Sequence, residues 1–233
     1  MTPERQLKTL FTCRPSVNKL KDSHYRFSST AEPNGRPAAL FMLIRGTSEV
    51  VWGVRDDVSA EIGDQLDRLA RDEPPLSDFE APPIHAAEYL ALVGGQVSSG
   101  PAFGFPDQIA QPADVALIDR LDLLERNFRG WTADEIPFRT PIVAVMHDGF
   151  PVSVCFCATW NTETVIEAGV ETAPDFRQRG YAARVTAAWA RAIRASGRTP
   201  LYSTNWTNTG SRGVARKLGL IQYATDWSLV PNI

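Results

Sequence analysis

The clearest hydrophobic pattern lies in the C-terminal half of the chain. Three apolar runs, over residues 141–147, 150–160 and 164–172, have the length and the β-branched and aromatic content of strands. Asp148-Gly149 separates the first two runs and is a strong signal for a two-residue hairpin turn. The pattern therefore predicts an antiparallel meander.

After the meander, the spacing of apolar residues becomes that of alternating helices and strands. Val185, Trp189 and Ile193 recur at helical spacing, so Trp189 is expected in the core. Gly197 and Gly219 suit the positions at which helices end. The predicted elements are a helix up to Ser196, a strand over 200–204, a helix from Asn208 to Leu218 and a strand over 221–230.

The N-terminal half has a weaker pattern. Two strands are predicted, over 38–45 and 49–55, and Ser59 is placed to cap an acidic helix that follows them. Other segments are predicted as a short helix around Leu7, a helix over 84–93, a short strand or pocket-lining loop over 98–106, and a helix from Asp114 to Gly130 carrying Leu117, Leu121, Leu124 and Phe128 on one face.

Length and composition bound the class of protein. A chain of 233 residues that is 43% hydrophobic can bury a core in one or two domains. We predict a division into residues 1–105 and 106–233. No apolar run reaches membrane-span length, and the three cysteines (Cys13, Cys155 and Cys157) give no disulfide framework or paired metal ligands. We therefore expect a cytoplasmic protein without a metal site or membrane contact.

Charge is unevenly distributed along the chain. The net charge is −3, yet the stretch from Phe176 to Thr225 has nine arginine or lysine residues and no aspartate or glutamate. A basic segment inside an acidic chain indicates a local polyanionic partner. The sequence pI of about 5.7 and the lack of a basic-aromatic ribbon favour a small polyanion over nucleic acid.

The segment Arg177-Gln178-Arg179-Gly180-Tyr181-Ala182 is a candidate binding site for that polyanion. It follows a predicted strand and opens a predicted helix, so free N–H groups and the positive end of the helix dipole point the same way. Gly180 and Ala182 are small enough for an anion to approach the main chain, and the arginines add donors. This combination is typical of phosphate binding, although an ordinary turn with solvated arginines has the same sequence features.

Two motifs resemble those of the GNAT superfamily of acetyltransferases. The run from Thr172 to Ala182 is similar to the family's coenzyme A pyrophosphate loop, Q/R-x-x-G-x-G/A, with Thr172 where the family has valine. The run from Asn208 to Leu220 resembles its second signature, an Asn-led helix that closes in K-L-G-F. The resemblance covers about residues 110–233. It implies an α/β (α+β) fold with a mainly antiparallel mixed sheet flanked by helices, here with an additional N-terminal α/β segment.

The resemblance implies an N-acetyltransferase that uses acetyl-CoA as acyl donor and a small amine as acceptor. Pantetheine would lie between the strand over 164–172 and the strand over 201–204, and backbone N–H groups near Val170 would polarise the thioester carbonyl. The residues expected to bind the cofactor are Val170, Thr172, Arg177, Gln178, Arg179, Gly180, Tyr181, Ala182, Asn208 and Ser211.

Three residues are candidates for acid–base chemistry. Glu167 and Glu171 have even spacing on a strand, so they share a face near the expected acetyl group, and either could be the general base. Many family members carry a tyrosine general acid where this chain has Ala215. Tyr202 is our candidate for that role; Ser203, Tyr223 or release of the thiolate into water are the alternatives.

Two other functions are compatible with the sequence. One is an acyl-CoA-binding module without turnover, and a more distant one is a nucleic-acid-binding or interaction protein. The N-terminal region is either a degenerate GNAT-like half, a cap on the acceptor side or a dimerisation element, so a homodimer is allowed.

Overall fold

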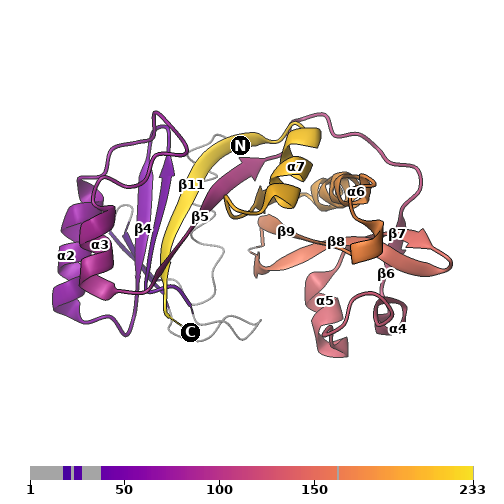
Figure 1. The fold of residues 1–233 in the computed structure, drawn as a ribbon, viewed down its shortest axis with the longest axis horizontal. Coiled ribbons are helices and arrows are strands. Elements are labelled where there is room, and N and C mark those ends of the chain that lie inside the picture. Colours follow the sequence, from indigo (N-terminus) through magenta and orange to yellow (C-terminus); the bar gives the residue numbers. More distant parts are fainter. Residues whose placement is uncertain (1–17, 22–23, 28–37, 162, 233) are drawn as a thin grey trace. The chain divides into compact units, whose positions relative to one another are not determined.

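The computed structural model describes residues 1–233 except 1–17, 22–23, 28–37, 162 and 233 (Figure 1). The short helix predicted around Leu7 lies outside the described residues. The chain divides into two compact units. The first unit contains residues 1–102, 204–208 and 222–233, and the second contains residues 103–203 and 209–221.

The sheet of the second unit confirms the predicted meander. Its strands run in the order β10-β9-β8-β7-β6, antiparallel except for the parallel pair β9 and β10. The bounds are β6 Ala116–Ile118, β7 Ile142–His147, β8 Phe150–Asn161, β9 Val165–Thr172 and β10 Thr199–Ser203.

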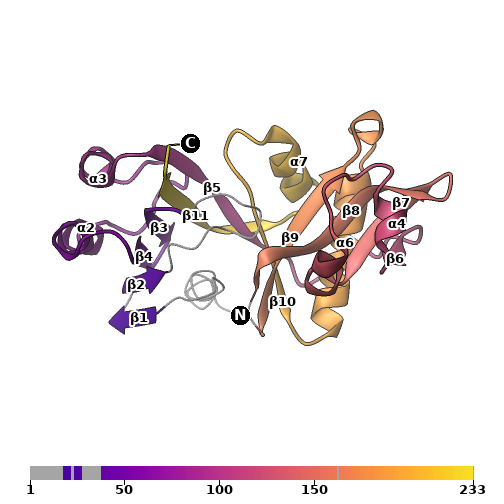
Figure 2. The ribbon, with the colours of Figure 1, turned by 90° about the horizontal axis from the view of Figure 1, so that it is seen from below.

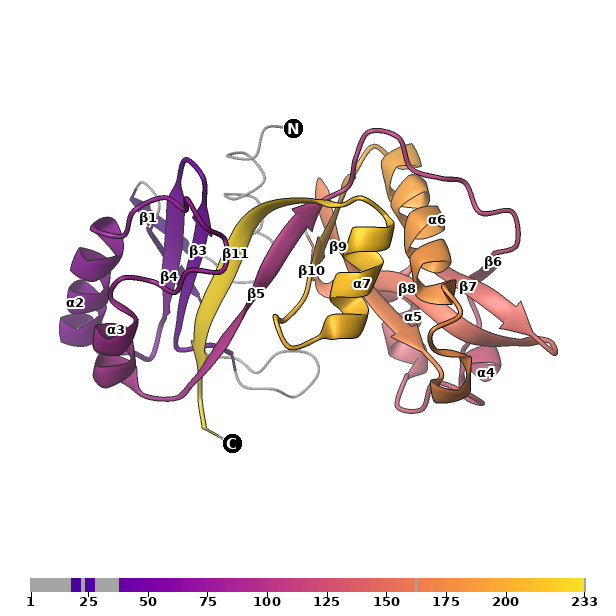
Figure 3. The ribbon, with the colours of Figure 1, turned by 45° about the horizontal axis from the view of Figure 1, so that its top comes forward.

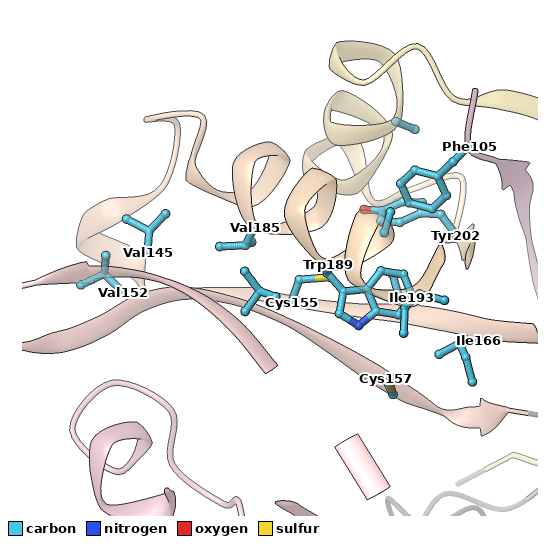
Figure 4. Close-up of a cluster of buried hydrophobic side chains, with 14 residues drawn as sticks. Phe105, Val145, Val152, Cys155, Cys157, Ile166, Val185, Trp189, Ile193 and Tyr202 are labelled. Carbon is cyan, nitrogen blue, oxygen red and sulfur yellow. The ribbon is translucent and has the colours of Figure 1, made fainter. Parts of the chain in front are cut away.

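Helices cover both faces of this sheet (Figure 1). Helix α6 (Tyr181–Ala195) packs Trp189, which is fully buried, against strand residues that include Cys155 and Cys157 (Figure 4). The opposite face packs against α4 (Leu121–Leu124) and α5 (Ile136–Arg139), and the 3₁₀ helix η1 (Ala133–Glu135) leads into α5. Residues 154–157 of β8 therefore alternate between two apolar cores, as the pleat of a strand requires.

The helix predicted from Asp114 to Gly130 is wrong over its first half. Residues 116–118 form strand β6, which pairs with Ile142–Ala144 of β7, and only residues 121–124 are α-helical. Leu117 is 72% exposed, whereas Leu124 and Phe128 are buried. The apolar spacing was compatible with a helix, but pairing with β7 satisfies the backbone of this segment as a strand.

In its described residues, the first unit combines strands β1 to β5 and β11 with helices α2 and α3. Figure 2 shows its strands in the order β1-β2-β4-β3-β11-β5, with helices α2 and α3 on one side. Ser59 caps α2 as predicted, accepting a hydrogen bond from the Ile62 N–H at 3.3 Å. The bounds are β1 Asn18–Lys21, β2 His24–Phe27, β3 Phe41–Gly46, β4 Val50–Arg55, α2 Ala60–Arg71, α3 Ala86–Val93, β5 Gln96–Gly104 and β11 Ile221–Val230.

The remaining predicted elements lie close to their expected bounds. The segment over 98–106 is mainly strand β5, and the last helix, α7, spans Thr209–Lys217. The protein thus has the predicted fold class, with a mainly antiparallel sheet flanked by helices. Across the part of the chain that the structure describes, no helix is both long enough and apolar enough to cross a membrane.

Candidate cofactor-binding and active site

The predicted phosphate loop joins β9 to α6. A 3₁₀ turn, η2 (Pro174–Phe176), follows the strand, and Gly180 occupies the N-cap of α6 with a φ of 79°. Arg177 Nε donates to the Thr172 carbonyl at 3.2 Å, and Arg179 donates to the Asp175 carbonyl at 2.9 Å. Both arginines therefore hold the loop in shape, while the first N–H groups of α6 have no acceptor within their own helix.

A third cation approaches this loop from α7. A Cβ atom added at Gly180 would lie 2.6 Å from Nζ of Lys217, so the ammonium sits almost against the glycine main chain. Figure 3 shows α7 beside α6. A cation at a helix N-terminus is repelled by the dipole unless an anion lies between them. Sequence reasoning counted Lys217 among the basic residues but did not assign it to the site.

Among the described residues, β9 has no strand partner beyond Glu167 on the edge that faces away from β8. Pairing with β10 ends at Leu201↔Glu167, whereas β9 continues beside β8 to Thr172. The Ala173 N–H donates to Val152 of β8, and strand N–H groups alternate in direction, so those of Val170 and Thr172 point to the open edge. The N–H groups of Val170 and Thr172, which were chosen from the sequence, thus point to the side where β9 and β10 diverge. This divergence of the two strands beyond Glu167 is called the fork.

Glu167 and Glu171 share one face of β9, as predicted, but have different surroundings. Glu167 stands at the closed end of the fork, where Ser203 Oγ donates to its carboxylate. Glu171 lies opposite Val154 of β8, on the face covered by α5.

The surroundings of Glu171 favour its protonated form. The residue is exposed, yet protein around the carboxylate removes part of its water and raises the pKa of Glu171. The positive charge of Arg139 and a hydrogen bond from Trp131 oppose this effect, and the negative charge of Glu135 adds to it. A carboxylate with a raised pKa is suited to accept a proton near neutral pH.

Tyr202 lies on the other face of the sheet from the two glutamates. It is 2% exposed and belongs to the core that packs against α6 and α7. Its hydroxyl and Ser211 Oγ of α7 are 2.7 Å apart, within hydrogen-bonding distance. Burial raises the pKa of Tyr202 to about 12, so the phenol keeps its proton at neutral pH. Ala215, the position of the family's tyrosine, is buried in the same core.

Three of the nine basic residues have structural partners elsewhere in the second unit. Arg194 donates to the carbonyls of Phe105 and Asp107, and Arg191 donates to that of Ile109. Arg184 forms an ion pair with Asp114. These arginines bind the segment over 105–114 to α6. Part of the charge pattern is therefore explained by contacts within the protein, without a ligand.

The other predicted cofactor-binding residues are divided between the units. Gln178 has a left-handed backbone with a φ of 61°, while Tyr181 and Ala182 are half-buried in the first turn of α6. Asn208 belongs to the first unit, where its N–H donates to the carbonyl of Asn205.

Comparison with known proteins agrees with this architecture. Residues 159–228 match the family model of the FR47-like proteins. A GCN5-related N-acetyltransferase-like protein from Streptococcus suis 89/1591 is 15% identical with a TM-score of 0.50, and the match covers 85% of this chain and 87% of that one. No curated protein sequence matches the chain.

Two further solved structures are similar. A GCN5-related N-acetyltransferase from Kribbella flavida is 24% identical with a TM-score of 0.48; the match covers 64% of this chain and 65% of that chain, slightly less than two thirds of its length. A GCN5-related N-acetyltransferase from Sphaerobacter thermophilus is 14% identical with a TM-score of 0.48. The match covers 87% of this chain and 80% of that chain.

The fold is therefore that of the GNAT acetyltransferases. The FR47-like match covers β9, the loop, α6 and α7, which are the elements that carry the candidate site.

Proposed function

We propose that this protein is an acetyl-CoA-dependent N-acetyltransferase that acts on a small amine. The observation that carries the proposal is the open edge of β9, which leads directly into the loop at Gly180. An extended ligand with a phosphate group at one end and amide groups along its length would match both features. Coenzyme A has this chemistry.

The phosphate end would bind at the start of α6. Gly180 leaves room for an oxyanion against the main chain, the N–H groups of Tyr181 and Ala182 belong to the first turn, and Lys217 supplies a nearby positive charge. Arg177 and Arg179 shape the loop through its own carbonyls and add to the local positive potential.

The pantetheine arm would lie along the open edge of β9 in the manner of an added strand. From Thr172 to Glu167 this edge extends about 17 Å at the usual rise of about 3.3 Å per residue. The N–H groups of Thr172 and Val170 would bind the arm and polarise the thioester carbonyl. The thioester would then lie toward the closed end of the fork.

The chemistry needs one proton acceptor and one stabilised leaving group. A glutamate on β9 would remove the proton of the acceptor ammonium, and the free amine would attack the thioester carbon. The tetrahedral intermediate would collapse with release of the coenzyme A thiolate, which would take a proton from Tyr202 or from water. Tyr202 carries a proton at neutral pH and its hydroxyl lies within hydrogen-bonding distance of Ser211, so a donor is present at this position.

A non-catalytic acyl-CoA-binding module is the second candidate. The observation that favours it is Ala215, which places no hydroxyl where many family members have a general acid. Nucleic acid is a less suitable partner, because Arg184, Arg191 and Arg194 are already engaged within the second unit.

Mass spectrometry of the purified protein with acetyl-CoA and a panel of amines tests the proposal. The panel should include a peptide N-terminus, lysine, a polyamine and an aminoglycoside. We expect an increase in mass of one acetyl group on at least one amine, and loss of this product in a Glu167→Gln, Glu171→Gln double variant. Coenzyme A binding without turnover of any amine would favour the binding module, and absence of coenzyme A binding would contradict both.

A further inference from the structure

Arg139 is fixed beside Glu171 by four contacts within the second unit. Its Nε and one terminal nitrogen donate to Oε1 of Glu135 at 3.2 and 2.5 Å. Its guanidinium carbon also lies 4.9 Å from the ring centre of Trp131 and 5.0 Å from that of Phe156. Two hydrogen bonds to one carboxylate oxygen and two aromatic faces leave this side chain little freedom.

The aromatic rings tie this cluster to the strand that carries Glu171. Phe156 of β8 pairs with Gly169 of β9, and a Cβ atom at Gly169 would lie 2.4 Å from the Phe156 ring. Trp131 meets Phe156 edge-on at 4.6 Å between ring centres. Because Glu171 is two residues from Gly169 on the same face, the cluster stands directly beside its carboxylate.

Glu135 is held as firmly as Arg139. Its second oxygen accepts from the Thr132 N–H at 2.8 Å in a capping box. The hydrogen bond from Arg139 is the main reason that the pKa of Glu135 is lowered, so Glu135 stays ionised. Its negative charge balances that of Arg139, and two of the guanidinium nitrogens are engaged by Glu135.

We propose that Arg139 and Glu135 are positioning residues for Glu171, and that this balanced pair keeps Glu171 ionised yet basic enough to take the proton of the acceptor ammonium. The inference rests on the proposed function and assigns the base to Glu171 rather than Glu167. In the step, the ammonium becomes a neutral amine and Glu171 becomes a carboxylic acid, which later returns its proton to water.

Within the part of the chain that the structure describes, the charged groups that act on Glu171 are Arg139 and Glu135. Arg139 and Glu135 face it from α5 and η1, Trp131 contributes a neutral N–H, and the facing residue of β8 is Val154. On β9 itself, Glu167 lies four residues away on the same face. The two members of the pair act on Glu171 in opposite directions, since Arg139 lowers its pKa and Glu135 raises it.

Opposite shifts in two variants therefore test the proposal. Arg139→Gln should raise the pKa of Glu171 and move the acidic limb of kcat/KM to higher pH. Glu135→Gln should lower that pKa and move the limb to lower pH. Arg129→Gln and Glu125→Gln, which change the same charges at exposed positions of the second unit, are the controls and should leave the limb in place.

A direct titration separates this inference from the proposed function. NMR of protein with ¹³C-labelled glutamate carboxyl groups, with the Glu171 signal assigned by its loss in Glu171→Gln, reports the pKa without turnover and also shows that each variant is folded. We expect the two variants to shift this signal in opposite directions together with the rate profile. The proposal would be overturned if both variants shifted the pKa of Glu171 in the same direction, or if that pKa shifted while the acidic limb of kcat/KM stayed in place. Neither result would contradict acetyl transfer itself. A wild-type protein that acetylates no amine would instead overturn the proposed function.

Discussion

The ammonium of Lys217 lies against the main chain of Gly180, close enough that a Cβ atom at residue 180 would be 2.6 Å from Nζ. These two residues come from different parts of the sequence, one at the N-cap of α6 and one in the last turn of α7. Together they place a positive charge and an unobstructed backbone at a helix N-terminus, which is the physical basis for our assignment of the phosphate site.

Gly180→Glu should abolish coenzyme A binding. The new side chain brings bulk and negative charge to the phosphate position, and it would compete for Lys217. Gly130→Glu is a matched control, because Gly130 also has a positive φ, of 95°, but has open space around it. Calorimetry of both folded variants measures the effect, and equal affinities would contradict the assigned site.

Lys217→Ala should weaken coenzyme A binding by about ten- to hundredfold, because a hydrogen bond to a charged group usually contributes a binding free energy of this size. Arg216→Ala is its control, since Arg216 is the preceding residue of the same helix and is exposed. The affinity of the wild type should fall more steeply with salt than that of Lys217→Ala. An equal loss in both variants would indicate general attraction rather than a specific contact.

The two glutamates of β9 should differ in kinetic effect. Glu171→Gln should lower kcat by about 10²–10⁴-fold with little change in coenzyme A affinity, because a general base acts on the chemical step. Glu167→Gln should have a smaller effect, because Glu167 is engaged by Ser203 at the closed end of the fork. Steady-state kinetics of both variants measures the two decreases in kcat. A larger decrease in Glu167→Gln than in Glu171→Gln would assign the general base to Glu167.

Sequence patterns predicted the meander, the loop and the two helices that follow because each depends on local spacing or on residues adjacent in the chain. The positions of Lys217 and Arg139 could not be obtained in this way, since they depend on how α7 and α5 pack. Nor could β6 be distinguished from a helix. Its apolar residues fit both periods, and the pairing of Ala116–Ile118 with β7 decides between them.

Tyr202→Phe should lower kcat and leave coenzyme A affinity unchanged if Tyr202 protonates the thiolate.

The same variant reports on stability at high pH. Because the pKa of Tyr202 is raised to about 12, the folded protein holds this proton more tightly than the unfolded chain does. Its contribution to stability should therefore be full below pH 10 and decrease between about pH 10 and 12. Denaturant unfolding of wild type and Tyr202→Phe across this range should show a larger decrease in the wild type than in the variant, because Tyr89, whose pKa is also raised, is present in both.

Strand β11 follows the second unit in the sequence but pairs within the first unit. Residues Ala224–Leu229 of β11 lie opposite Phe41–Gly46 of β3, and Trp227 and Leu229 are buried in the core that also contains Phe41 and Tyr89. A fragment of residues 106–233 would keep β11 but lose β3, so these two large apolar side chains would be exposed beside an unpaired strand edge. A fragment of residues 106–221 lacks β11 and keeps β6 to β10, α6 and α7. We therefore expect the shorter fragment to be monomeric at higher concentrations than the longer one, and to retain more coenzyme A binding per mole of protein.

Size-exclusion chromatography and calorimetry of the two fragments make the comparison, with Trp227→Ser in the longer fragment as a control that should restore part of its solubility. A longer fragment that is monomeric and binds coenzyme A as well as the full chain would show that β11 does not depend on β3, and would support a division of the chain near residue 105.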